Sequence, residues 1–299
     1  MRNSLDTLMT QTVGLQYTLP NVNASIPRIT ISTKSDECYR VLTADDDLAG
    51  VIYNGIIDYS YEESRIDLNR LDVIQKRALK QSLKFDESET EDRQLNYGFY
   101  GEVLLFLMLQ KFYNLDTVIS RGHFYNPLNN TETTGYDTYQ MVLKSDGCVE
   151  LWFGEVKFHK SFRTGVRQIL NKISHSLSDD YFGTNIIAME DYETFLNTDA
   201  GISPILDAFR NDPDVNLAQI AHEHGMAFVY PMLVVFNDDN ESYDEIIKKV
   251  VNYTNRHYST LPILFSVPYS IFFMFLPVKA VKDVKKLVRS WILTGQSVI

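Results

Sequence analysis

Apolar and polar positions along the chain repeatedly change period between the spacing of helices and that of strands. Apolar residues recurring every three or four positions predict a helix, and short apolar runs or strict alternation predict a strand. Residues 1 to about 60 read as short strands and loops, with alternation at Arg28–Ser32 and Glu37–Leu42. The later helices are predicted at Leu68–Leu83, Leu95–Phe112, Arg163–Leu177, Ser203–Phe209, Tyr243–Asn255 and Lys279–Leu293, and the later strands at Thr138–Lys144, Cys148–His159, Ala227–Phe236 and Ser270–Leu276. This alternation predicts an α/β or mixed α+β fold.

One long apolar run raises the question of a membrane segment. Leu261–Val278 is interrupted by Pro262, Pro268 and Pro277. A membrane helix needs about 20 predominantly apolar residues, and three prolines disfavour a regular helix. The run is therefore interpreted as containing a buried strand, and a cytoplasmic protein without a membrane segment is expected.

A hairpin is predicted where Asp146-Gly147 separates two strand patterns. Asp-Gly between such runs is a strong signal for a two-residue turn. If Asp146 is the turn centre, Asp137, nine residues before it, faces Glu155, nine residues after it. Facing side chains of an antiparallel pair lie roughly 5 Å apart on one face, and Lys157 shares that face. A register slip of one residue would turn one strand's side chains to the other face.

Two carboxylates facing each other in a half-buried sheet repel unless something compensates them. A divalent cation does so, and hard oxygen ligands suit Mg²⁺ or Mn²⁺. Such a metal polarises a phosphoryl oxygen and lowers the pKa of bound water, while Lys157 can orient that water. Taken alone, a Glu-x-Lys pair more often marks an exposed face of an edge strand, because it occurs by chance in most proteins of this length. The apolar neighbours of Glu155 and Lys157 on both faces, however, are typical of a central strand.

Glu102 is the next candidate, because it lies in the long helix that is apolar nearly all round. An uncompensated carboxylate is costly to bury there. The alternative is a glutamate placed in the first turn and favoured by the helix dipole. Gly98 and Gly101 on adjacent turns permit close backbone packing.

Charge is distributed unevenly over the 299 residues, whose formal net charge is −11. This balance disfavours a protein that holds nucleic acid over its whole surface. It leaves room for a local basic site, and four residues could form a basic stripe suited to a phosphate backbone: Lys160, Arg163, Arg167 and Lys172. A solvated charged helix face is the commoner meaning of such a run. Two cysteines are too few for a disulfide framework or a four-cysteine zinc site.

These motifs together resemble the PD-(D/E)xK nuclease superfamily. The resemblance lies in a helix carrying Glu102, then Gly-x-Asp ending at Asp137, then Glu155-Val156-Lys157 on the next strand, and a helix with Arg and Gln. Tyr136 stands where the superfamily usually has proline. More narrowly, Gly-x-x-Gly-Glu-x-Leu-Leu, Gly-x-Asp and Gly-Glu-x-Lys-Phe are similar to the HamA family, nuclease subunits of Hachiman antiphage systems, and to the related AbpA subunits.

The resemblance implies a restriction-endonuclease-like core, with a mixed central sheet flanked by helices and an added N-terminal lobe. It implies that Asp137 and Glu155 bind Mg²⁺, with Mn²⁺ as a substitute, and that Glu102 supports the metal shell. Lys157 would position the attacking water. The resemblance also implies a DNA substrate and a HamB-like helicase subunit as partner.

The interpretation is a metal-dependent DNA nuclease, the effector of an antiphage complex. Residues 1–85 are predicted to form a lobe that contacts the partner or shields the site, and residues 86–299 the nuclease domain. Deleting residues 1–60 would then free cutting from partner control. Two alternatives stay open: a catalytically silent nuclease fold kept as a scaffold, and an RNase with the same metal site.

Overall fold

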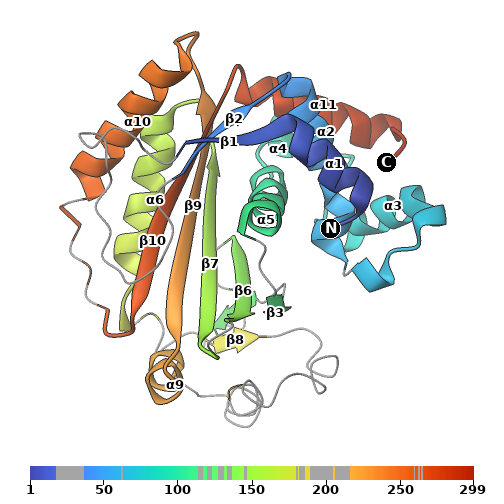
Figure 1. The fold of residues 1–299 in the computed structure, drawn as a ribbon. Coiled ribbons are helices and arrows are strands. Elements are labelled where there is room, and N and C mark those ends of the chain that lie inside the picture. The colour runs from blue at the N-terminus through green and yellow to red at the C-terminus, as the bar shows by residue number, and fades with distance from the viewer. Residues whose placement is uncertain are drawn as a thin grey trace.

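The protein is described from a computed structural model, in which a seven-stranded mixed sheet lies between two layers of helices (Figure 1). The residues described are 1–17, 37–61, 63–113, 117–119, 123–126, 131–132, 137–144, 147–179, 181, 186–188, 205, 216–258, 260–261, 263 and 265–299. The helices are α1 (Asn3–Thr12), α2 (Asp45–Ser60), α3 (Leu71–Gln81), α4 (Glu91–Leu95), α5 (Phe99–Tyr113), α6 (Phe162–Ser176), α9 (Leu217–Glu223), α10 (Tyr243–Tyr258) and α11 (Val281–Thr294). The strands are β1 (Val13–Tyr17), β2 (Glu37–Val41), β3 (Thr117–Ile119), β4 (His123–Asn126), β5 (Thr131–Glu132), β6 (Thr138–Leu143), β7 (Val149–Phe158), β8 (Ile186–Ala188), β9 (Ala227–Asn237) and β10 (Tyr269–Val278). The predicted mixed α/β class is confirmed.

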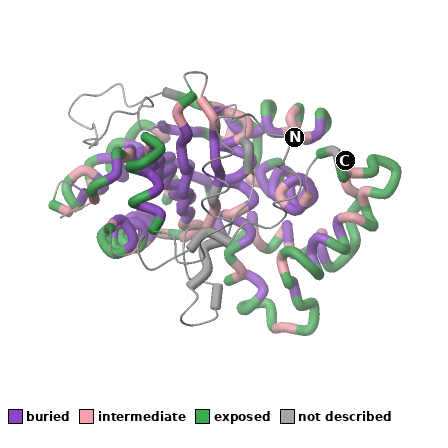
Figure 2. Tube along the Cα trace, turned by 90° about the horizontal axis from the view of Figure 1, so that it is seen from below, coloured by how far each residue is buried: buried purple, intermediate pink, exposed green. Residues whose placement is uncertain are grey.

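The main sheet has the order β1-β2-β10-β9-β7-β6-β3, and β4, β5 and β8 form a separate small sheet. Strands β7, β9, β10 and β2 run parallel, whereas β1, β6 and β3 pair antiparallel with their neighbours. The central strands β9 and β10 are nearly continuous apolar runs. Strands of that composition are buried on both faces, and this is why the sheet needs helices on each side. Figure 2 shows buried positions concentrated at the centre of the molecule.

Helices α6 and α10 cover one face of the sheet, and α5, α2 and α11 cover the other (Figure 1). Alternate residues of β7 divide between the two hydrophobic clusters. Leu151 and Phe153 belong to the cluster with α6, and Trp152 and Val156 to the cluster with α5. The two-residue period of the strand therefore decides which helix layer each β7 side chain meets.

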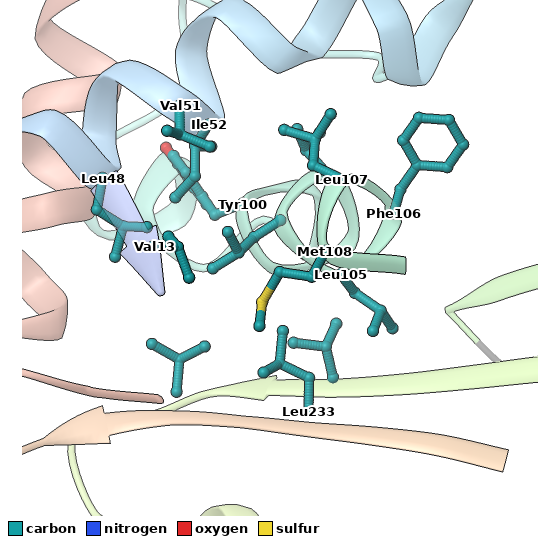
Figure 3. Packing of buried hydrophobic residues seen from close by; sticks show 14 of the residues in the cluster. Val13, Leu48, Val51, Ile52, Tyr100, Leu105, Phe106, Leu107, Met108 and Leu233 are labelled. Atoms are coloured by element: carbon teal, nitrogen blue, oxygen red, sulfur yellow. The ribbon is translucent and has the colours of Figure 1, made fainter. Parts of the chain in front are cut away.

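Helix α5 is apolar all round because it has protein on both sides. Figure 3 shows Leu233 of the sheet on one side of it and Val51 and Ile52 of α2 on the other. Gly101 allows α5 to approach β7, since a Cβ there would lie 2.9 Å from a Val156 methyl carbon.

Among the described residues of the segment 1 to about 60, the prediction of strands and loops was wrong over α1 and α2, which are helices. Two short strands are present, β1 and, at the predicted position, β2. Three aspartates, Asp45–Asp47, occupy the first turn of α2, where the helix dipole favours negative charge, and an apolar stretch follows. The predicted Arg28–Ser32 strand lies outside the described residues, as does the Ser203–Phe209 helix apart from Ile205.

The N-terminal segment is built into the sheet and its core. Strands β1 and β2 extend the main sheet, and α2 packs against α5 and α11. Asp58 of α2 is buried and paired with Arg2. Deleting residues 1–60 would therefore remove part of the core, and it cannot serve as a clean test of partner control. The proposed division at residue 85 stays a prediction.

The remaining predicted elements are confirmed within a few residues. Leu261–Val278 yields the strand β10, and no helix in the part of the chain described has the length and apolar character needed to cross a membrane. The predicted hairpin is also present. Thr138 pairs with Gly154 and Leu143 with Val149, which is the register centred on residue 146. Gly147, at the turn, has a φ of 84°. Glycine adopts this left-handed region without strain because it has no Cβ.

Candidate functional site

The candidate site lies where β6 begins and β7 continues past it. The last ladder pair is Thr138 with Gly154, and Asp137 stands one residue further on. Its backbone N–H donates to the Gly154 carbonyl at 2.8 Å, and its carboxylate Oδ2 accepts the Val156 N–H at 2.7 Å. The Asp137 side chain thus takes a hydrogen bond that a continuing strand would otherwise make, and this fixes the carboxylate against β7.

Glu155 lies in the centre of this site with its side chain only 1% exposed. Lys157 donates to its Oε1, and Lys172, from α6 on the same face, donates to its Oε2. The two lysine side chains are 27% and 23% exposed. A buried carboxylate held by two ammonium groups satisfies the rule that buried charge requires a partner.

Burial and neighbouring charges have opposite effects on the pKa values of Glu155 and Lys157. Burial and the charge of Asp137 raise the pKa of Glu155, against the lowering effect of Lys172 and Lys157. Burial alone would lower the pKa of Lys157, but Glu155, Asp137 and Glu102 together raise it above its ordinary value. Lys157 is therefore an ammonium at neutral pH. Its chemistry is that of a hydrogen-bond donor and positive charge, not that of a base.

Glu102 joins the same electrostatic cluster from α5, the helix in the other layer. Burial, followed by the charges of Asp137 and Glu155, raises its pKa to about 7 against the lowering effects of Tyr59 and Lys157. Tyr59 of α2 donates its hydroxyl to Glu102 Oε2 at 3.1 Å. Gly98 gives this carboxylate room, because a Cβ there would lie 2.5 Å from Glu102 Oε1.

Oxygen donors of this kind fit a hard divalent cation. The charge of Asp137 raises the pKa of Glu155, and the charges of both raise the pKa of Glu102, effects that a bound cation would oppose. Within the described residues no three His, Cys, Asp or Glu side chains are grouped closely enough to hold a metal. The carboxylates instead use hydrogen-bond donors and lysines as partners. The donor set therefore fits Mg²⁺ in chemical type, with both Glu155 oxygens already engaged.

The predicted basic stripe divides into two parts. Lys160, Arg163 and Arg167 are exposed, and the Arg163 guanidinium carbon lies 4.7 Å from the centroid of the Phe162 ring. Lys172, the fourth member, is partly buried against Glu155. A role for these residues in binding nucleic acid stays a prediction.

Two site contacts were not found from the sequence. Tyr59 reaches Glu102 from 43 residues upstream, in a segment interpreted as strands and loops. Lys172 was assigned to the stripe because of its helical spacing, although it lies 17 residues from Glu155 along the chain. Neither contact has a local signal, because each depends on how α2 and α6 pack around the sheet.

The sequence matches the HamA family model over residues 24–292. That span includes Glu102, Asp137, Glu155, Lys157 and Lys172, so the whole candidate site lies inside the matched region. Among curated proteins, none matches the chain significantly.

Proposed function

The chain belongs to the HamA family, and from that premise we propose that it is a metal-dependent DNA nuclease, the effector subunit of a Hachiman antiphage complex with a helicase partner. The observation that carries this proposal is the convergence of Asp137, Glu155 and Lys157 at the point where β6 begins beside β7. Two carboxylates and one ammonium at a single strand end can supply the metal ligands and the positive charge that metal-assisted hydrolysis of a phosphodiester uses.

In the proposed reaction Asp137 and Glu155 would hold Mg²⁺, and Glu102 would support that shell. When bound, the metal polarises the phosphoryl oxygen and lowers the pKa of a water molecule. Lys157, protonated at neutral pH, donates hydrogen bonds to the attacking water and to the charge that develops on the phosphate.

Substrate approach is proposed to follow the exposed cations of α6 and its preceding loop. Lys160, Arg163 and Arg167 are the local positive charges on a chain with a net charge of −11. Neutralising phosphates with these side chains releases counterions, so binding should weaken with salt. Fewer basic residues should give a shallower dependence on salt concentration.

The test is cleavage of plasmid, linear duplex, single-stranded DNA and RNA with Mg²⁺ or Mn²⁺, with and without the genomic-neighbour helicase and ATP. Wild type is compared with Glu155→Gln and Lys157→Met, which nearly preserve side-chain size. Glu150→Gln is the matched control on the same strand, since Gln can still accept the Trp152 indole N–H that Glu150 accepts at 3.0 Å. Thermal melting checks that each variant folds.

We expect the control to cut like wild type and both site variants to lose activity. Cutting only when the helicase is present would add partner control, and RNA cutting without DNA cutting would favour the RNase alternative. Absence of cutting in every condition, or equal cutting by Glu155→Gln, would refute the nuclease and leave the scaffold alternative.

A further inference from the structure

Lys172 places a second ammonium on the carboxylate that the proposed function gives to the metal. Its Nζ contacts Glu155 Oε2, while Lys157 contacts Oε1. Both oxygens of Glu155 therefore face positive charge, and the carboxylate itself is 1% exposed. Glu155 has little solvent to compensate its charge, so these two lysine side chains are what neutralises it.

The two lysines are attached differently. Lys157 is two residues from Glu155 on the same strand and shares its face. Lys172 lies on α6, across the packing interface between helix and sheet, near the C-terminal end of that helix. Its side chain is long, flexible and partly exposed, so it can turn to solvent without any change in backbone. Gly165, by contrast, lets the α6 backbone lie close to the sheet, because a Cβ there would lie 3.1 Å from a Val234 methyl carbon.

Charge counting sets the consequence for metal binding. Asp137, Glu155 and Glu102 supply at most three negative charges, and Lys157 and Lys172 supply two positive ones. A divalent cation entering beside both ammonium groups would meet a nearly neutral site. If one ammonium group moves away from Glu155, the site becomes negatively charged and one carboxylate oxygen becomes available. Hard cations bind such negatively charged oxygen ligands.

We propose that Lys172 is a displaceable counter-ion of the metal site: it holds Glu155 in the metal-free protein and leaves Glu155 Oε2 when a divalent cation binds. This inference rests on the proposed function. Because the ammonium and the cation compete for one oxygen, Lys172 weakens metal binding, and metal binding releases Lys172 by the same factor. Anything that draws Lys172 away, such as a phosphate group, therefore favours loading of the metal.

The test measures Mn²⁺ binding to the full-length chain without nucleic acid, by titration calorimetry and by the electron paramagnetic resonance signal of free Mn²⁺. The variants are Lys172→Met and Lys172→Gln, either of which removes the ammonium. Arg167→Met is the matched control, because it removes one positive charge from the exposed side of the same helix. Lys172→Arg retains the charge, and Glu155→Gln removes the proposed ligand.

We expect Lys172→Met and Lys172→Gln to bind Mn²⁺ roughly tenfold more tightly than wild type, the change produced by losing a modest competing ion pair. Arg167→Met and Lys172→Arg should stay within about twofold of wild type. If wild type binds Mn²⁺ through Glu155 and the neutral Lys172 variants bind equally or more weakly, the counter-ion proposal is overturned while the metal site stands. If no protein binds Mn²⁺, or Glu155→Gln binds as wild type does, the proposed metal site itself fails and this inference with it.

Discussion

Burial of Glu102 should make the metal-free protein less stable as the pH rises. The pKa of this carboxyl is raised from 4.5 to about 7, first by burial and then by the charges of Asp137 and Glu155. Between these pH values the folded protein holds a proton that the unfolded chain has released. The free energy of unfolding therefore falls across this window and levels off above pH 7.

The magnitude follows from the two pKa values, which are 4.5 in the ordinary carboxyl and about 7 in the folded protein. At about 1.4 kcal/mol per pKa unit, this difference corresponds to an unfavourable contribution of about 3 kcal/mol at pH 8. Glu102→Gln removes the ionisation while its amide oxygen can still accept the Tyr59 hydroxyl. With an unfolding entropy of about 2.1 cal/mol/K per residue, about 3 kcal/mol raises the Tm of a chain of this length by about 5 °C.

The assay is thermal melting in EDTA at pH 5 and pH 8, with Glu87→Gln as a control that removes an exposed carboxylate. We expect Glu102→Gln to melt higher than wild type at pH 8 and close to wild type at pH 5, where wild-type Glu102 is mostly protonated. A rise that is equal at both pH values would show that the gain does not come from ionisation. No rise at pH 8 would refute the placement of Glu102 in a desolvated, negatively charged site.

Three further expectations concern the packing around the site. Burial lowers the pKa of Lys285 from 10.5 to about 8. Lys285→Met should therefore be more stable than wild type by up to about 3 kcal/mol at neutral pH, as measured by urea unfolding. This gain should disappear as the pH rises from about 8 to 10.5, because the folded wild type then loses the proton that burial disfavours. A gain that stays constant across that pH range would contradict the reasoning. Arg2 and Asp58 form a buried ion pair at 2.8 Å. Arg2→Met should thus cost roughly 3 kcal/mol in urea unfolding. The double variant with Asp58→Asn should recover part of that cost. If the stability losses of the two single variants simply add, the ion pair contributes no coupling energy. A Cβ at Gly154 would overlap Thr138 Oγ1. Gly154→Ala should consequently lower stability by about 1–3 kcal/mol, and Thr138→Ala should partly rescue it in thermal melts.

Local patterns predicted most of the sheet and the hairpin that carries the site. The Asp-Gly turn and the alternating flanks give the register, which runs from Leu143 with Val149 to Thr138 with Gly154 and so brings Asp137 beside the strand that carries Glu155. Prediction failed over α1 and α2, where short mixed patterns were interpreted as strands. The apolar character of α5 predicted burial, but not that α2 would be the element covering it.

The sequence by itself determined which chemical groups share the end of one hairpin, because strand period and turn type are local properties. Tertiary structure decided which side chains balance the charges of those groups. Tyr59 reaches Glu102 through the packing of α2 on α5, and Lys172 reaches Glu155 through the packing of α6 on β7. These contacts join residues 43 and 17 positions apart in the sequence. No periodic pattern of apolar and polar residues predicts contacts at such separations, because they depend on how the helix layers pack on the sheet. The charge balance of the site is therefore a property of the assembled layers, whereas the grouping of Asp137, Glu155 and Lys157 is a property of the hairpin.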